Sequence, residues 1–188
     1  MAWRVLFILS LVIVAIAVIA RAWFGKRPLA RHGTVSCRAD AATWQAIFGE
    51  SASLPPEGRI PAEVCGQALR AAALQRLKKE DPRAAATHEG GRHFIMAVPP
   101  LTLVVVIFAV IVAKLPLFGG LAVILAASAL AALTGVLSVG SELRVVGAAV
   151  RDIRRRHVFA RSEEEAAVAA CAQAAVWMEA LPPILRWI

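Results

Sequence analysis

The sequence has few acidic residues, few cysteines and no repeated unit. Its 188 residues include 13 aspartates and glutamates against 21 lysines and arginines, which gives a net charge of +8. The three cysteines form no C-x-x-C pair, and their odd number argues against a zinc ribbon and against a disulfide framework. No aromatic-rich basic segment or nucleic-acid-binding motif is present. We therefore expect reduced, packed thiols and no nucleic-acid partner.

Apolar residues, by contrast, are abundant. They make up 59% of the chain, and the mean hydropathy is +0.67, which is too apolar for a soluble domain. Long runs without charge cover Val5–Ala20, Phe94–Ala113 and Leu121–Val139. The sequence thus predicts an all-α integral membrane protein with three transmembrane helices, namely an N-terminal anchor and a helical hairpin. The lipid bilayer is its first expected partner.

The basic residues around the first run predict the orientation. Arg4 and Arg21 bound it, and further basic residues follow at once (Lys26, Arg27 and Arg31). Val18-Ile19-Ala20 resembles a signal-peptide cleavage site, so a cleaved signal peptide is the alternative. A basic block resists translocation, which favours an uncleaved anchor with the N-terminus outside. We expect residence in a bacterial inner membrane, with residues 24–93 and 140–188 in the cytoplasm.

Four segments follow from these patterns: an anchor over 1–23, a cytoplasmic helical region over 24–93, the hairpin over 94–139 and a C-terminal helical region over 140–188. Within them, helical spacing predicts helices at Ala41–Phe48 and Ala62–Lys79, and another that starts at Pro82 with Asp81 as N-cap. Lys114-Leu115-Pro116 and Gly119-Gly120 are expected to break the hairpin. Ser162–Glu165 reads as a capping box, with Ser162 at the N-cap of an alanine-rich C-terminal helix that ends near Ala180.

One stretch, Ala84–His93, carries a candidate for chemistry. His88 and Glu89 begin an H-E-x-x-H pattern, in which two histidines one helical turn apart hold zinc and the glutamate accepts a proton from the metal-bound water. The second histidine position holds Arg92, however, and His93 comes one residue late. On a regular helix His88 and His93 point about 140° apart, so only a π-bulge at Gly90-Gly91 would bring them together. The hairpin should return Glu142 to the same side as a third ligand.

The residues from about 84 to 188 resemble the YugP-type neutral zinc metallopeptidases of bacterial membranes. The likeness rests on the anchor, the H-E helix, the hairpin and the glutamate that opens a helix, and its motifs fall on Val139–Arg144, Ala149, Ser162–Glu165 and Ala174–Ala180. The resemblance implies that His88 and Glu142 are zinc ligands and that Glu89 is the general base. Two positions depart from the pattern: Arg92 replaces the second ligand, and Arg144 replaces an acidic residue.

The departures favour a site that has lost its metal, with no cofactor. Arg92 would then pair with Glu142 or Glu89 in place of zinc. We expect a non-catalytic scaffold or accessory subunit that binds other membrane proteins through the small-residue faces of Leu121–Val139 and Ala166–Ala180. One alternative is an active zinc endopeptidase in which His88, His93 and Glu142 hold the metal and Glu89 is the base. Another is an accessory subunit of a larger complex whose resemblance to the peptidases is accidental.

Overall fold

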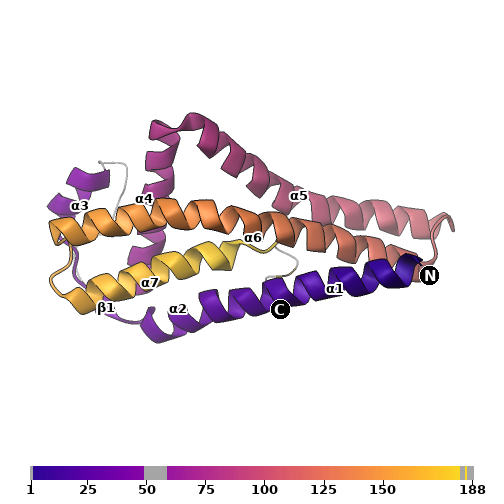
Figure 1. The fold of residues 1–188 in the computed structure, drawn as a ribbon, viewed down its shortest axis with the longest axis horizontal. Coiled ribbons are helices and arrows are strands. Elements are labelled where there is room, and N and C mark those ends of the chain that lie inside the picture. Colours follow the sequence, from indigo (N-terminus) through magenta and orange to yellow (C-terminus); the bar gives the residue numbers. More distant parts are fainter. Residues whose placement is uncertain (1, 49–58, 183–184, 186–188) are drawn as a thin grey trace.

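The computed structural model describes residues 2–48, 59–182 and 185, and this part of the chain is mostly helical (Figure 1). The helices are α1 (Ala2–Arg21), the π-helical turn η1 (Ala22–Lys26), α2 (Arg27–His32), α3 (Ala41–Phe48), α4 (Ala62–Glu80), α5 (Pro82–Ile111), α6 (Leu117–Arg156) and α7 (Ser162–Glu179). Two short antiparallel strands, β1 (Ser36–Cys37) and β2 (Ile60–Pro61), pair Ser36 with Pro61 and Cys37 with Ile60.

Among the described residues, three helical segments are long and apolar enough to cross a membrane: Trp3–His32, Pro82–Ile111 and Leu117–Arg156. The predicted helical class and the number of such segments are therefore confirmed. The helices run past the predicted segment boundaries, however. The predicted anchor ended at residue 23, whereas the helix continues through η1 and α2. In the same way, α5 joins the H-E stretch to the second apolar run, and α6 joins the third run to the basic segment.

The first segment packs beside the hairpin with its N-terminal end at the hairpin turn (Figure 1). Phe7 of α1 and Phe118 of α6 bring their ring centroids within 5.5 Å there. The elements with most of the charge, α2, α4, α7 and the C-terminal half of α6, gather at the other end (Figure 1). All three apolar segments thus have one end at the level of the hairpin turn (Figure 1).

The hairpin turn lies earlier than the glycine pair suggested. The helix of α5 ends at Ile111, and α6 begins at Leu117, so the turn closes before Gly119-Gly120. A Cβ on Gly120 would lie 2.9 Å from Cγ1 of Val106 across the hairpin. The prediction of a turn at these glycines was wrong, because both lie within α6, and Gly120 lets α6 approach α5 closely. Pro99 and Pro100 lie within α5 without ending it.

The main core sits at the charged end, where α4 crosses α7 (Figure 1). A Cβ on Gly66 would lie 2.7 Å from the backbone nitrogen of Ala172, so glycine allows this close crossing. Cys37, Cys65 and Cys171 are fully buried in the core, and all three thiols are free, as predicted. Burial raises the pKa of the Cys65 thiol to about 12. The thiols therefore act as small apolar side chains.

Local signals at helix starts gave mixed results. Ala41–Phe48 is a helix as predicted, and Asp81 caps α5 by accepting a hydrogen bond from the Ala84 N–H at 3.0 Å. At α7 the predicted N-cap was wrong by one residue. Arg161 has the extended backbone of the N-cap position, and its carbonyl accepts the N–H groups of Glu164 and Glu165. Ser162 is consequently the first helical residue, and the N-cap residue Arg161 makes no side-chain capping bond.

Candidate functional site

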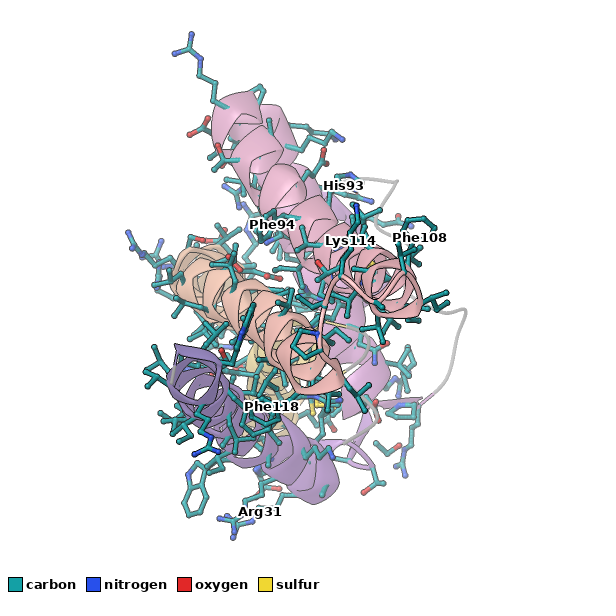
Figure 2. All side chains as sticks on the ribbon, turned by 90° about the vertical axis from the view of Figure 1, so that its right-hand side faces the viewer. Arg31, His93, Phe94, Phe108, Lys114 and Phe118 are labelled. Carbon is teal, nitrogen blue, oxygen red and sulfur yellow. The ribbon has the colours of Figure 1, made fainter. Side chains whose placement is uncertain are left out.

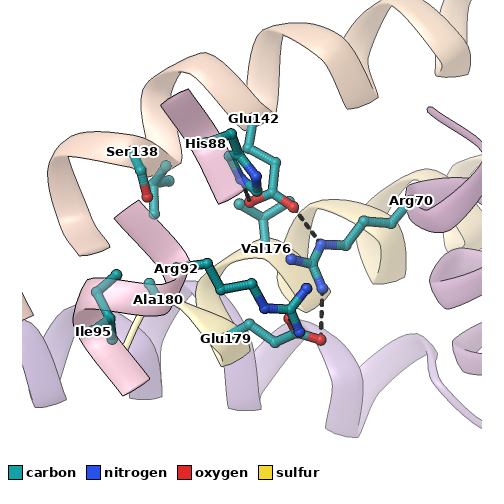
Figure 3. A pocket seen from close by; sticks show the side chains of 10 residues that line it. Arg70, His88, Arg92, Ile95, Ser138, Glu142, Val176, Glu179 and Ala180 are labelled. Carbon is teal, nitrogen blue, oxygen red and sulfur yellow. Dashed lines mark hydrogen bonds and ion pairs between the residues drawn. The ribbon is translucent and has the colours of Figure 1, made fainter. Parts of the chain in front are cut away.

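A charged cluster joins four helices where the apolar part of the hairpin meets the charged end. Arg70 comes from α4, His88 and Arg92 from α5, Glu142 from α6 and Glu179 from α7 (Figure 3). The space between them is a cavity of about 20 Å³. A cavity of this size holds about one water molecule and has no room for a peptide side chain.

Glu142 is the centre of the cluster. It is 6% exposed, and both of its carboxylate oxygens are engaged. Oε1 accepts a hydrogen bond from Nε of Arg70 at 2.5 Å, and Oε2 lies 3.1 Å from Nε2 of His88. Because the hairpin places α6 beside α5, the residues that the sequence analysis put forward as first and third metal ligands do meet.

Arg70 bridges two carboxylates. It is 7% exposed, and its Nη1 lies 2.7 Å from Oε1 of Glu179, while its Nε holds Glu142. Burial acts to lower the pKa of the guanidinium, but the hydrogen bonds to Glu142 and Glu179 outweigh burial and hold that pKa above its ordinary value. A permanently charged group thus lies among α4, α6 and α7.

Arg92 completes the cluster from the more open side. Its Nη2 lies 2.9 Å from Oε2 of Glu179, and about half of its side chain is exposed. The sequence analysis expected Arg92 to pair with Glu142 or Glu89, whereas the structure pairs it with Glu179. Glu142 is already held by Arg70, and α7 presents its last turn to α5 at this level.

Glu89 and His93 lie apart from the cluster. Glu89 forms an ion pair with Lys78 at 3.0 Å, and both side chains are mostly exposed. The helix stays regular through Gly90-Gly91, so no π-bulge turns His93 inward. Figure 2 shows His93 on the outer side of α5, where it is exposed. Of the candidate residues, the structure brings together His88 and Glu142, and neither Glu89 nor His93 joins them.

The residues present do not fit a zinc ion. Within the described ranges 2–48, 59–182 and 185, no group of three or more histidine, cysteine, aspartate or glutamate side chains is arranged to hold a metal. A zinc site needs three protein ligands in a catalytic centre and four in a structural one. Here His88 and Glu142 supply two, and the guanidinium of Arg70 lies on the carboxylate where a cation would bind.

Sequence reasoning missed Arg70 and Glu179. Arg70 follows the fully buried Leu69 and lies one turn from the buried Gly66 and Ala73. An arginine on the apolar face of a predicted helix signals a buried acidic partner, because long charged side chains are seldom buried unpaired. Glu179 ends a helix of small apolar residues, and no local pattern points to its partners.

No family model, curated protein or solved structure matches this chain. The likeness to zinc metallopeptidases therefore rests on sequence motifs, and the function is argued from the cluster and the helices that carry it.

Proposed function

We propose that this chain is an integral membrane protein derived from a zinc metallopeptidase, in which an ion-pair network has taken the place of the metal. In this proposal it acts as a non-catalytic scaffold or accessory subunit for other membrane proteins. One observation carries the loss of the metal: the Arg70 guanidinium is bound to Glu142 at 2.5 Å, beside His88. A positive side chain thus neutralises the carboxylate that a zinc ion would need.

The geometry also argues against hydrolysis. A general base must reach the water that it activates, within about 3 Å or through one further water. Glu89, the candidate base, instead pairs with Lys78 on the exposed side of α5. The cavity beside Glu142 has a volume of about 20 Å³, and the larger hollow of about 270 Å³ that His88 and Glu89 line does not reach Glu142.

Membrane insertion is supported by length, apolarity and exposure. The outward faces of the apolar segments carry large side chains that no described part of the chain covers, for example Leu101, Val104 and Phe108 on α5 and Leu133 and Leu137 on α6. Such a surface needs lipid or protein around it. The charged end carries most of the arginines, so the excess of positive charge favours that end as cytoplasmic and the N-terminus as external.

The structure shows that the small-residue faces expected to bind a partner are packed inside the protein. Small residues of α7, such as Ala172 and Ala175, are buried against the protein's own helices, and Ala129 and Ala132 of α6 pack against α1. These faces are used internally. The surface left for another membrane protein is the outer face of α5 and α6, which is made of large apolar side chains.

The test is to purify the full chain from membranes in mild detergent with zinc supplied during expression. We expect no stoichiometric zinc by elemental mass spectrometry, and no cleavage of unfolded casein above that of a Glu89→Gln variant. Stoichiometric zinc together with Glu89-dependent cleavage would establish the active-peptidase alternative. A partner that co-purifies in fixed ratio, and is lost when Leu133 and Leu137 are changed to serine, would support the accessory role.

A further inference from the structure

A second polar feature lies further along α4 and α6 from the Arg70 cluster, towards the C-terminal ends of both helices. It is a groove of about 520 Å³ between α4 and the C-terminal half of α6. Its walls include small apolar residues such as Ala73 and Ala149, and its rim carries four arginines, one glutamate and one aspartate. Pockets of about 300–1,000 Å³ are the usual size for small ligands. The rim gives this groove a net positive charge.

One arginine of the rim, Arg76, forms ion pairs with both acidic residues of the rim. Nε of Arg76 lies 2.7 Å from Oε1 of Glu80, and its Nη1 lies 2.7 Å from Oδ2 of Asp152. The other three rim arginines, Arg144, Arg151 and Arg155, are exposed, and the structure records no ion pair between them and any acidic residue of the described chain. The groove therefore offers guanidinium groups without acidic partners.

These three arginines share one face of α6. At 100° per residue, Arg151 lies about 20° from Arg144 around the helix, and Arg155 about 40° from Arg151. The Arg151 side chain also folds back along the helix, since a Cβ on Gly147 would lie 3.8 Å from its Nη1. Its guanidinium thus moves towards the turn that carries Arg144. Three like charges held along one groove repel one another, and an anion between them relieves that repulsion.

The position of the groove also restricts the ligand. Arg144 comes five residues after Val139, the last residue of the third apolar run, and so lies about 7.5 Å beyond it along the helix. Arg144 thus lies at the depth of lipid headgroups, and Arg151 and Arg155, about 18 Å and about 24 Å beyond Val139, lie on the aqueous side of that layer. Guanidinium groups bind phosphate oxygens through two parallel N–H donors, and phosphate is the main anion at that depth.

We propose that the groove between α4 and α6 binds a phosphate-bearing anion, held by Arg144, Arg151 and Arg155. The phosphate can belong to an anionic phospholipid that enters from the membrane side or to a soluble phosphate ester that enters from the cytoplasmic side. The chemistry of recognition is the same in both cases. This site is separate from the Arg70 cluster and does not depend on the loss of zinc.

The test uses the purified full chain in uncharged detergent, with binding measured by titration calorimetry. The probes are short-chain phosphatidylglycerol, short-chain phosphatidylcholine and inorganic pyrophosphate. We expect saturable binding of phosphatidylglycerol or of pyrophosphate, and none of phosphatidylcholine, whose headgroup carries no net charge. Preference for phosphatidylglycerol identifies a lipid site, and preference for pyrophosphate identifies a site for a soluble ester.

The decisive comparison pairs two double variants of equal charge. Arg151→Gln/Arg155→Gln removes groove arginines, whereas Arg154→Gln/Arg156→Gln removes exposed arginines of the same helix that do not line the groove. Each guanidinium at a membrane surface contributes about fivefold in affinity, so the groove pair should weaken binding about 25-fold and the control pair far less. All four side chains are exposed, so both variants should fold, and unchanged helicity by circular dichroism checks this. Equal losses in the two variants, or no saturable binding of either anion by the wild type, would overturn the proposal.

Discussion

The buried ion pair between Arg70 and Glu142 makes the sharpest prediction for stability. Replacement of Arg70 by methionine keeps most of the side-chain length and removes the charge. Glu142, which is 6% exposed in the wild type, then loses the guanidinium of Arg70 and keeps its contact with His88. Removing one partner of a buried pair costs about 3–5 kcal/mol, because the other charge is left without compensation. For a chain of this size that corresponds to a fall in Tm of about 6–20 °C.

The assay is thermal unfolding of the full chain in detergent, followed by circular dichroism. Arg76→Met is the matched control, because Arg76 also lies on α4 and also joins two carboxylates, but its side chain is 45% exposed. An exposed pair contributes at most about 1 kcal/mol, so this control should shift Tm by only a few degrees.

A double variant separates the charge effect from simple loss of packing. Arg70→Met/Glu142→Gln removes both charges of the pair, and exchanging a buried ion pair for less polar groups of similar size is often close to neutral. The double variant should therefore recover much of the stability that Arg70→Met loses. Equal losses for Arg70→Met and Arg76→Met, or a double variant as unstable as the single one, would refute the role given to this pair.

Three further predictions concern packing, thiol reactivity and the metal. Gly135→Ala should lower Tm sharply, because the new Cβ would meet the carbonyl oxygen of Ala180. Gly140→Ala should raise Tm slightly, because its Cβ has open space and alanine favours the helix over glycine by about 1 kcal/mol. Burial raises the thiol pKa of Cys37 and of Cys171 to about 11. Both thiols should therefore resist alkylation at pH 8 in the folded protein and react only after unfolding, as followed by mass spectrometry. Rapid labelling of the native chain would contradict the buried core. Finally, the Arg70→Ala/Arg92→His variant should bind zinc, because it removes the competing guanidinium and places two histidines one turn apart beside Glu142. The single Arg92→His variant should bind less zinc by elemental analysis. Equal metal contents in the two variants would show that Arg70 does not exclude the ion.

Sequence reasoning worked where a local signal or a simple topology decides the outcome. Asp81 before Pro82 predicted the start of α5, because an N-cap and a first-turn proline act within a few residues. The meeting of His88 with Glu142 followed from the return of the hairpin, although the two residues are 54 positions apart in the chain. In each case the local sequence or the chain topology leaves few alternative structures.

Reasoning from the sequence failed where packing decides. Gly120 looked like a turn residue, but its hydrogen-sized side chain is used to bring α6 against Val106 of α5. The partner of Arg92 depended on which carboxylate Arg70 already held, and that depends on how α4 and α7 cross at Gly66. No pattern within a single helix encodes such a crossing.

The continuity of α6 has a mechanical consequence. One helix of 40 residues, about 60 Å long, runs from the hairpin turn to the arginines of the α4–α6 groove without a proline inside it. Its neighbour α5 contains Pro99 and Pro100, and prolines are the usual places where helices bend. A tilt or rotation of α6 within the bilayer would therefore be transmitted along the rigid helix to the groove. In α5 the same motion would bend the helix at its prolines. Glu142 lies between the two ends of α6, and its bonds to Arg70 and His88 would fix the point about which α6 tilts.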